Sequence, residues 1–398
     1  MTGYTIFIVA GEPSGDLHGA NLIREMLRAD PEIAVSGIGG EQMSATRMEL
    51  RHDLASEAIM GFTEVLRKFG HIRAVFRDTV EFLAETRPDL LVLIDYPGFN
   101  LRLAQHAKKL GIRTVYYICP QVWAWGRGRV ERIARLVEKA IVILDFEQSI
   151  YSDAGLSVEF VGHPLVDRVE GTPLDERFIA ERRNQAYTTV GLLPGSRPQE
   201  VRRHLPIMLR SSEILHQELA GLQLMVACPN RRIHQLAEQI VSAWSDKQVH
   251  KRSSCPRVEV VSGKTYEVIG LSDLCLVASG TATLETAYFL KPMLVIYKTS
   301  FISWLLARAV IKVRHISMVN ILAGKEVVPE FIQFDARPKR MAGEALALLT
   351  NGRRRAEIEL VLSQIRDRLG RPGASERAAR AVFELLRRNP TAQTAPTG

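Results

Sequence analysis

A turn near residue 280 has the residue types of an anion-binding site. It follows the apolar run Leu274–Ala278, which predicts a buried strand, and it leads into a helical pattern. Small residues at such a turn let an anion approach the backbone N–H groups, and the helix dipole adds roughly half a positive charge there. The turn consists of Ser279, Gly280, Thr281, Ala282 and Thr283, and Glu285 lies about one helical turn further on.

Glu285 indicates which kind of anion this turn would hold. A carboxylate close to a phosphate is unfavourable unless the ligand also carries hydroxyl groups that donate to it, as the ribose of a nucleotide does. The stretch therefore predicts a nucleotide site. Capping of an ordinary helix explains the same residues and stays open as the alternative, because helix starts of this kind are common.

A second junction of the same type precedes it in the chain. The apolar run at 190–193 predicts a strand, and Gly195, Ser196 and Arg197 follow it before a helical pattern. Arg197 adds a planar, permanent charge that suits a phosphate. The chain has no Asp-x-Asp pair, so we expect a diphosphate to be held by these donors rather than by a metal, and we predict neither a metal nor a cofactor.

Asp95 follows the apolar run at 89–94, which predicts a central strand of a parallel sheet. Ligands of open α/β sheets bind at the carboxyl ends of the strands. Asp95 therefore lies where a general base is expected. The alternative is a cap for the next helix, which begins near Asn100.

Three other junctions carry polar or aromatic residues. Gly11-Glu12-Pro13-Ser14-Gly15-Asp16 ends the first strand pattern and contributes Glu12, Ser14 and Gly15 as candidates for a substrate pocket. This junction is not the GxGxxG fingerprint, so a dinucleotide is not favoured. The loop at 120–129 contains Trp123, which either lines the pocket or fills a buried loop. His163 is either a site residue or a residue that packs at a hinge.

The segment 59–83 combines apolar residues at helical spacing with basic ones. Its first part contains Met60, Phe62, Val65, Leu66 and Phe69, interleaved with arginine and lysine. One interpretation is an amphipathic helix that faces the core. The other is a surface that touches a membrane or admits acyl chains. A second segment of this kind follows at 301–313.

The composition indicates a globular protein that binds anionic partners. The 398 residues carry a net charge of +8, and 46% are hydrophobic, which is ordinary for a globular protein. The four cysteines lack the spacing of metal ligands, so we expect a reduced, cytosolic chain. We expect no signal peptide and no transmembrane helix. Without zinc-finger or RNP motifs, the basic charge favours a membrane surface or a phosphorylated ligand over nucleic acid.

Strand and helix patterns alternate in two successive runs. This predicts an α/β protein with two Rossmann-like domains that face a cleft. We expect an acceptor domain at 1–168 and a domain that binds the nucleotide-linked donor at 188–335, joined by a polar linker within 170–187. Closing helices occupy 336–388, and the tail 389–398, rich in Pro, Thr and Ala, is expected to be disordered.

Seven motifs, taken together and in order, resemble those of the lipid-A-disaccharide synthase family over about residues 5–330. They are Gly11-Glu12-Pro13-Ser14-Gly15-Asp16, Ile94-Asp95-Tyr96-Pro97-Gly98-Phe99-Asn100, Pro120-Gln121-Val122-Trp123-Ala124-Trp125, Gly162-His163-Pro164, Leu193-Pro194-Gly195-Ser196-Arg197, Ser279-Gly280-Thr281-Ala282-Thr283-Leu284-Glu285 and Asn320-Ile321-Leu322-Ala323-Gly324. Pro13 and the extended tail depart from the family pattern, but neither departure removes a candidate site residue.

The resemblance implies a GT-B fold whose C-terminal helices pack back on the first domain, and an inverting glycosyltransferase. The donor would be UDP-2,3-diacylglucosamine and the acceptor 2,3-diacylglucosamine 1-phosphate (lipid X). The products would be the β-1,6-linked lipid A disaccharide 1-phosphate and UDP. Such an enzyme works at the inner face of the bacterial inner membrane. Exchange of the closing helices between copies would permit a homodimer.

Residue roles follow from the same resemblance. Asp95 would accept the proton of the acceptor hydroxyl, and Arg197 with the N–H groups near 280–283 would stabilise the departing diphosphate. Glu285 would hold the ribose, and Asn320 would line the donor pocket. A UDP-sugar 2-epimerase of similar fold needs no lipid acceptor and stays as an alternative. A non-catalytic binding module is a further one, against which the position of Asp95 argues.

Overall fold

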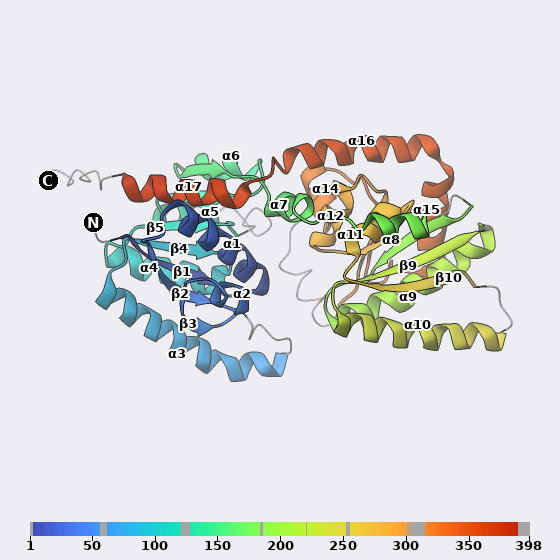
Figure 1. Cartoon of the computed structure of the whole chain (residues 1–398), viewed down its shortest axis with the longest axis horizontal. Helices are drawn as coiled ribbons and strands as arrows, with labels where there is room; N and C mark the ends of the chain where they lie inside the picture. Colours follow the sequence, from blue (N-terminus) through green and yellow to red (C-terminus); the bar gives the residue numbers. More distant parts are fainter. Residues whose placement is uncertain are drawn as a thin grey trace. The chain divides into compact units, whose positions relative to one another are not determined.

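A computed structural model describes residues 3–55, 62–120, 128–183, 186–219, 221–251, 255–300, 304 and 315–388, without the side chains of 62–69 and 251. Met60, Trp123 and the tail 389–398 lie outside the described residues, as do the side chains of Phe62, Val65, Leu66 and Phe69. The chain forms two compact units, each built on one parallel sheet (Figure 1). Unit 1 comprises Met1–Asp167 and Leu369–Gly398, and unit 2 comprises Arg168–Arg368.

The sheet of unit 1 has seven parallel strands in the order β3-β2-β1-β4-β5-β6-β7. The strands are β1 (Thr5–Ala10), β2 (Ala34–Gly39), β3 (Glu49–Asp53), β4 (Leu90–Ile94), β5 (Thr114–Tyr117), β6 (Lys139–Val142) and β7 (Ser157–Phe160). All five residues of β4 are buried, which confirms the central strand predicted at 89–94. The strand β3 was not predicted, because this edge strand is mostly polar and only partly buried.

Helices cover both faces of this sheet. Side chains alternate along β1, so Ile6 and Ile8 join the core formed with α1 and α17, while Phe7 and Val9 join the core formed with α3 and α4. Figure 1 accordingly shows α17 and α3 on opposite sides of the strands. The helices of unit 1 are α1 (Pro13–Ala29), α2 (Glu41–Ser44), α3 (Phe62–Thr86), α4 (Pro97–Lys109), α5 (Gly128–Leu136), α6 (Glu147–Ser152) and α17 (Ala374–Arg387), and α7 (Pro164–Glu170) spans the boundary between the units.

The sheet of unit 2 has six parallel strands in the order β10-β9-β8-β11-β12-β13. The strands are β8 (Thr188–Leu193), β9 (Leu222–Cys228), β10 (Arg257–Ser262), β11 (Leu274–Ala278), β12 (Met293–Tyr297) and β13 (Glu330–Ile332). The helices are α8 (Glu176–Arg182), α9 (Pro198–Glu218), α10 (Arg231–Lys251), α11 (Thr265–Leu271), α12 (Thr281–Tyr288), α14 (Met318–Ala323), α15 (Pro338–Thr350) and α16 (Gly352–Arg368). The sequence analysis missed β13, a three-residue strand at the edge of the sheet.

The C-terminal helices divide between the two units, which corrects the expectation that all of them pack on the first. Helix α15 packs on α9, and α16 packs on α12 and α14, all within unit 2. Only α17 packs on α1 in unit 1. The apolar faces explain this division: α15 buries Met341 and Leu348, whereas Ala378 and Val382 of α17 belong to the core of the first sheet.

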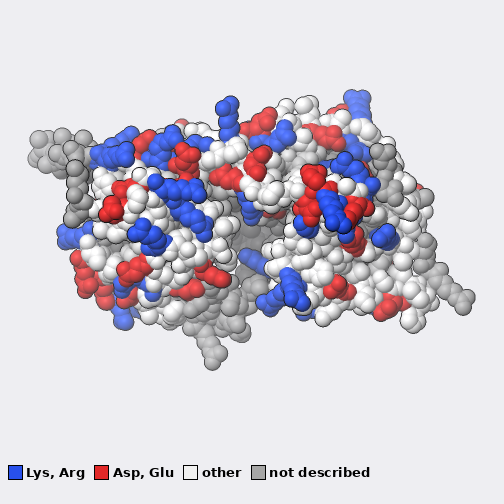
Figure 2. Space-filling view, in the orientation of Figure 1, with Lys and Arg blue, Asp and Glu red and all other residues white. Residues whose placement is uncertain are grey.

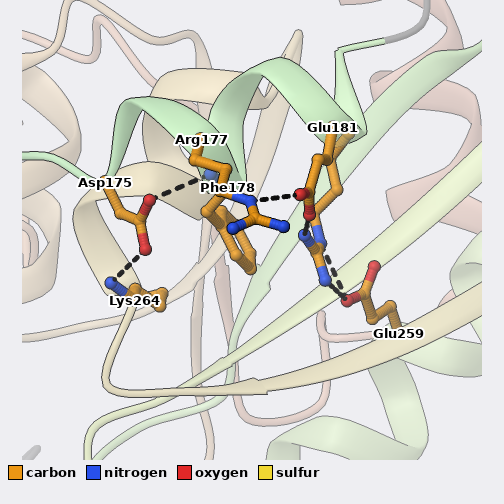
Figure 3. A network of polar contacts seen from close by, with 7 residues as sticks. Asp175, Arg177, Phe178, Glu181, Glu259 and Lys264 are labelled. Carbon is orange, nitrogen blue, oxygen red and sulfur yellow. Dashed lines mark hydrogen bonds and ion pairs between the residues drawn. The ribbon is translucent and has the colours of Figure 1, made fainter.

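The segment 170–187, expected to be a linker, contains α8 and is fixed to unit 2 by polar contacts (Figure 3). The Asp175 carboxylate accepts a hydrogen bond from the Phe178 N–H at 3.0 Å and pairs with Lys264 at 2.9 Å. These two contacts lower the pKa of Asp175, the Lys264 contact most. At the other end of α8, Arg182 pairs with Glu259 at 2.8 Å. Part of this polar segment therefore forms a short helix of unit 2, close to the boundary between the units.

Gly11 lies directly after β1 and faces the ring of Tyr96. A Cβ atom at position 11 would lie 2.2 Å from Cδ1 of that ring. The sequence therefore needs glycine here so that the residues that follow β4 can approach the residues that follow β1. Both segments contribute candidate site residues, so this contact links the fold to the site.

Replacing Gly11 by alanine is expected to lower the free energy of unfolding by about 1–3 kcal/mol, because the Tyr96 ring and the backbone around it must shift. Midpoints of urea unfolding measure the change. Gly98→Ala is the matched control, since it lies within α4 with no atom within 4 Å of an added Cβ. That variant should be as stable as the original or more stable by up to about 1 kcal/mol. A Gly11→Ala protein of unchanged stability would contradict the packing argument.

Candidate functional site

The chain turns sharply where β4 ends, and this turn places Asp95. Asp95 and Tyr96 have φ of 43° and 48°, so two consecutive non-glycine residues adopt the left-handed conformation before Pro97 begins α4. This conformation costs energy at each residue and persists only where neighbours enforce it. The Asp95 carbonyl accepts hydrogen bonds from Tyr116 Oη at 2.6 Å and from Asn100 Nδ2 at 2.7 Å. Burial keeps the pKa of Tyr116 well above its usual range, so its hydroxyl remains a donor.

Asp95 lines a cavity of about 550 Å³ within unit 1, a volume in the usual range for small-molecule sites. Burial, and next the negative charge of Glu12, raise the pKa of Asp95 to about 6. A carboxylate with this pKa is ionised at neutral pH yet more basic than an ordinary one, as a general base requires. The cavity is lined by Glu12, Asp95, Pro97, Ile118, Cys119, Pro120, Arg129, Ile143, Leu144 and Glu147.

Two charged residues of this cavity were missed by the sequence analysis as site candidates. Glu147 is buried and opens α6, three residues after Leu144 at the end of the run that forms β6. Its position just beyond a strand end was the available signal, the same one that identified Asp95. Arg129 is the second residue of α5. In the sequence it is one arginine in a loop, and nothing around it indicates that it lines a cavity.

The remaining candidates of unit 1 have different environments. Glu12 lines the cavity, whereas Ser14 is exposed at the first turn of α1. Gly15 is buried, and a Cβ there would lie 3.4 Å from the Ala10 side chain, so it lets α1 pack closely on the sheet. His163 Nδ1 accepts a hydrogen bond from the Leu165 N–H at 3.1 Å, at the start of α7. This contact favours the packing role for His163.

In unit 2, the turn at 279–283 forms the N-terminus of α12. Gly280 has φ of 151° and ψ of −160°, a conformation essentially reserved for glycine. Gly280 and Thr281 are exposed, and the N–H groups of a first helical turn have no partner within the helix. Ser279 Oγ donates to the Ile316 carbonyl and Thr283 Oγ1 to the Gly280 carbonyl. These two hydroxyls therefore fix the turn, and the backbone remains the surface offered to an anion.

The loop after β8 holds an anion of its own. The N–H groups of Ser196 and Arg197 both donate to one oxygen of the Glu200 carboxylate, at 3.1 and 3.2 Å. Gly195, with φ of 118°, allows this curvature. The loop therefore has the geometry predicted for an anion site, but Glu200 occupies its backbone donors. The Arg197 side chain lies 3.9 Å from the same carboxylate but is 62% exposed, so a ligand can reach it.

Glu285 is held by residues that the sequence analysis did not identify. Its side chain is only 12% exposed and forms an ion pair with Arg168 of α7. Burial raises the pKa of Glu285, while Arg168 and a hydrogen bond from Tyr266 of α11 oppose that increase. Arg168 and Tyr266 thus position the carboxylate and offset part of the effect of burial. Arg168 is more than 100 positions away in the sequence and Tyr266 is 19 away, so no local pattern reveals them.

Asn320 is fully buried, and its amide group braces a turn. Oδ1 accepts from the N–H groups of Val327 and Val328 at 2.7 and 3.0 Å. Nδ2 donates to the Val328 carbonyl and to Glu330, both at 2.8 Å. Asn320 therefore supports its own turn from inside the protein, and its role in lining the donor pocket stays a prediction.

His204 joins two loops at the carboxyl ends of β8 and β12. Its Nδ1 lies 2.9 Å from the Pro194 carbonyl, and the Lys298 N–H donates to Nε2 at 3.1 Å. Because a carbonyl can only accept, the proton must be on Nδ1. Burial lowers the pKa of His204, so the neutral ring fixes both loops. Among the described residues, no cluster of three or more His, Cys, Asp and Glu side chains could hold a metal ion.

Solved structures of low sequence identity share the fold. A glycosyltransferase of kitacinnamycin superposes with a TM-score of 0.62 at 14% identity, covering 96% of this chain and 99% of the other. The UDP-GlcNAc 2-epimerase from Neisseria meningitidis, solved with UDP-GlcNAc, gives 0.60 at 11% identity, covering 96% and 100%. With the two parallel sheets, these similarities confirm the predicted α/β fold of the GT-B type and do not distinguish a transferase from an epimerase.

Sequence comparison makes that distinction. The family model of lipid-A-disaccharide synthetase matches residues 6–385. A lipid-A-disaccharide synthase from Syntrophus aciditrophicus is 44% identical over 390 residues, which cover 98% of this chain and all of the relative. One from Anaeromyxobacter dehalogenans is 40% identical over 382 residues, covering 96% and 97%. The chain therefore belongs to the lipid-A-disaccharide synthase family of glycosyltransferases.

Proposed function

We propose that the chain transfers the acylated sugar of UDP-2,3-diacylglucosamine to the 6-hydroxyl of 2,3-diacylglucosamine 1-phosphate. Family membership supports the reaction class, a UDP-sugar donor and a glucosamine-phosphate acceptor. The observation that carries the proposal is Asp95, a carboxylate of raised pKa at a strand end that lines a cavity. The acceptor domain is then unit 1, and the donor is bound by unit 2.

The reaction needs one bond to form and one to break. The acceptor oxygen attacks the anomeric carbon of the donor, and its proton passes to the Asp95 carboxylate. The bond from that carbon to the UDP oxygen breaks, and UDP leaves with the electron pair. The N–H groups at the start of α12 and the Arg197 guanidinium are the groups proposed to stabilise the negative charge of the diphosphate.

The nucleotide site also needs a group that recognises ribose. We assign this role to Glu285, whose carboxylate can accept from two vicinal hydroxyls while Arg168 keeps it charged. Tyr266 completes the support from α11. Because Asn320 and Glu330 hold the neighbouring turn from inside, they are supporting residues in this proposal.

We also propose that the enzyme works at an anionic membrane surface, on the cytoplasmic side. The net charge of +8 and the first part of the apolar, basic segment, at 59–69, support this. Further along α3, apolar residues such as Val75 and Leu83 are buried in the core of unit 1. None of the helices described is long and apolar enough to cross a bilayer. On the face shown in Figure 2, Lys and Arg lie among Asp and Glu, so the segment 59–69 is the better candidate for the contact.

Replacing Asp95 by asparagine is expected to lower kcat by about 10²–10⁴-fold, the usual contribution of a general base. UDP affinity should not change, because the proposed nucleotide site lies in the other unit. For the unaltered enzyme, activity should be present above pH 6 and should fall as the pH drops through about 6, where Asp95 becomes protonated. Release of UDP from the donor, with and without the acceptor, measures turnover.

Asp89→Asn is the control for this experiment, because Asp89 lies at the opposite end of the same strand and bonds Thr5. Its turnover should stay near normal. An Asp95→Asn enzyme with normal turnover would show that another group accepts the proton. Conversion of the donor to an epimer without acceptor would instead support the epimerase alternative.

The ribose contact is tested by comparing UDP with 2′-deoxy-UDP. Glu285→Ala should weaken UDP binding by about 10- to 100-fold, since hydrogen bonds to a charged group contribute about 1.5–3 kcal/mol. It should change the affinity for 2′-deoxy-UDP much less, so the preference for ribose should shrink. Calorimetric titration measures both. Equal loss for the two nucleotides would indicate a structural role for Glu285 instead.

Arg168→Met examines the same contact from its partner. Without the cation, the pKa of Glu285 should rise further. As the pH is lowered, the variant should therefore lose UDP binding at a higher pH than the unaltered enzyme does. Arg177→Met is the control, because this side chain is 89% exposed on α8 and pairs with Glu181. An unchanged pH profile in Arg168→Met would separate Arg168 from the nucleotide site.

Membrane contact is tested by sedimentation with lipid vesicles. Binding should require anionic lipid and weaken as salt rises from 0.1 M toward 1 M, because the Debye length falls from about 10 Å to about 3 Å. Phe69→Asp should reduce the apolar part of the contact. Equal binding to neutral and anionic vesicles would contradict the electrostatic component.

A further inference from the structure

The cavity beside Asp95 has an uneven distribution of charge. Its lining includes the carboxylates of Glu12, Asp95 and Glu147. Among the described residues that line it, Arg129 is the only one with a positive side chain. A cavity of this composition repels an anionic ligand everywhere except next to that arginine. The proposed acceptor is such a ligand, because it carries a phosphate.

The sheet topology spreads these groups along one edge. Glu12 follows β1, Asp95 follows β4, and Glu147 opens the helix after β6, with β5 between β4 and β6. Neighbouring strands are about 4.8 Å apart, so the distance from β1 to β6 is roughly 14 Å. That span suits a sugar with a substituent at each end better than a single small anion. Apolar residues such as Ile118 and Leu144 line the cavity as well.

Arg129 has the chemistry of a phosphate ligand. It is the second residue of α5, a nine-residue helix. A guanidinium group can donate two parallel hydrogen bonds to a phosphate, and it stays charged at any pH at which the enzyme works. The first turn of α5 adds partial positive charge in the same region. The helix is anchored by Val130 and Ile133, which are buried against the first sheet.

We propose that Arg129 binds the phosphate of the acceptor and thereby selects phosphorylated acceptors. This inference rests on the proposed function. The phosphate on C1 and the 6-hydroxyl carried by C5 are attached on either side of the ring oxygen, so a phosphate fixed at Arg129 restricts where the hydroxyl can lie within the cavity that Asp95 also lines. Arg129 is a specificity-determining residue in this scheme and takes no part in the proton transfer.

The test compares two acceptors, 2,3-diacylglucosamine 1-phosphate and the same lipid without the phosphate. Arg129→Gln should lower kcat/KM for the phosphorylated acceptor by about 10- to 100-fold, mainly through KM, since a charge-assisted contact is lost. It should leave the slow reaction of the unphosphorylated acceptor unchanged. The preference for phosphate should therefore collapse. Arg129→Lys should restore part of it, because the charge returns without the planar fork.

Arg132→Gln is the matched control, since Arg132 is exposed on the same helix and does not line the cavity. Its preference for the phosphorylated acceptor should equal that of the unaltered enzyme. If Arg129→Gln lowered kcat/KM equally for both acceptors, or if it left the preference for the phosphorylated acceptor unchanged, the assignment would be overturned.

The experiments distinguish failure of the proposed function from failure of the role assigned to Arg129. If the unaltered enzyme releases no UDP with both substrates present, the proposed function is wrong. Titration with glucosamine 1-phosphate and with glucosamine then still tests Arg129. The unaltered protein should bind the phosphorylated sugar more tightly, and Arg129→Gln should bind both sugars alike. No preference for the phosphorylated sugar in the unaltered protein would overturn the inference.

Discussion

The left-handed turn at Asp95 and Tyr96 is the constraint on which the proposed acceptor site depends. A strand that continued straight would carry Asp95 along the sheet, whereas the turn stops β4 and leaves the carboxylate lining a cavity. Two such residues cost about 1–3 kcal/mol each. Asn100 and Tyr116 offset that cost by bonding the Asp95 carbonyl. Gly11 is part of the same arrangement, because only a residue without a Cβ leaves room for the Tyr96 ring.

The nucleotide half of the proposed site is stabilised by internal carboxylates and amides. Glu200 satisfies the loop after β8, Glu330 accepts from the Ile316 and Ser317 N–H groups, and Asn320 braces the turn beyond α14. Loops that already have their hydrogen bonds need not be ordered by a ligand, which reduces the entropy cost of binding. Because Glu200 accepts from the N–H groups of Ser196 and Arg197, a diphosphate can bind those groups only if it displaces the Glu200 carboxylate.

Local patterns in the sequence predicted most of the fold. The strands β4, β8 and β11 lie where the apolar runs at 89–94, 190–193 and 274–278 predict them. The edge strands β3 and β13 were missed because an edge strand buries little and is short or polar. The division of the closing helices between the units was missed for a different reason. Periodicity reveals which face of α15 or α17 is apolar, but not which sheet or helix will cover it.

The candidate site was predictable only where it follows strand ends. Asp95, Glu12 and the turn at Gly280 all lie at such positions, and the structure places them at the carboxyl edges of the two sheets. Arg168 and His204 were not predictable, because each acts on a residue more than 90 positions away. Asn320 adds a contact that its motif did not predict, since its amide group braces the backbone of its own turn.

Charge makes the base and the acceptor of the proposed reaction interdependent. Asp95 has a pKa of about 6 because burial and Glu12 already disfavour its negative charge. A phosphate in the same cavity would add to that repulsion and raise the pKa of Asp95 further. In the proposed scheme, Arg129 beside the phosphate opposes that change, so the residue proposed to recognise the acceptor would also keep the proposed base ionised.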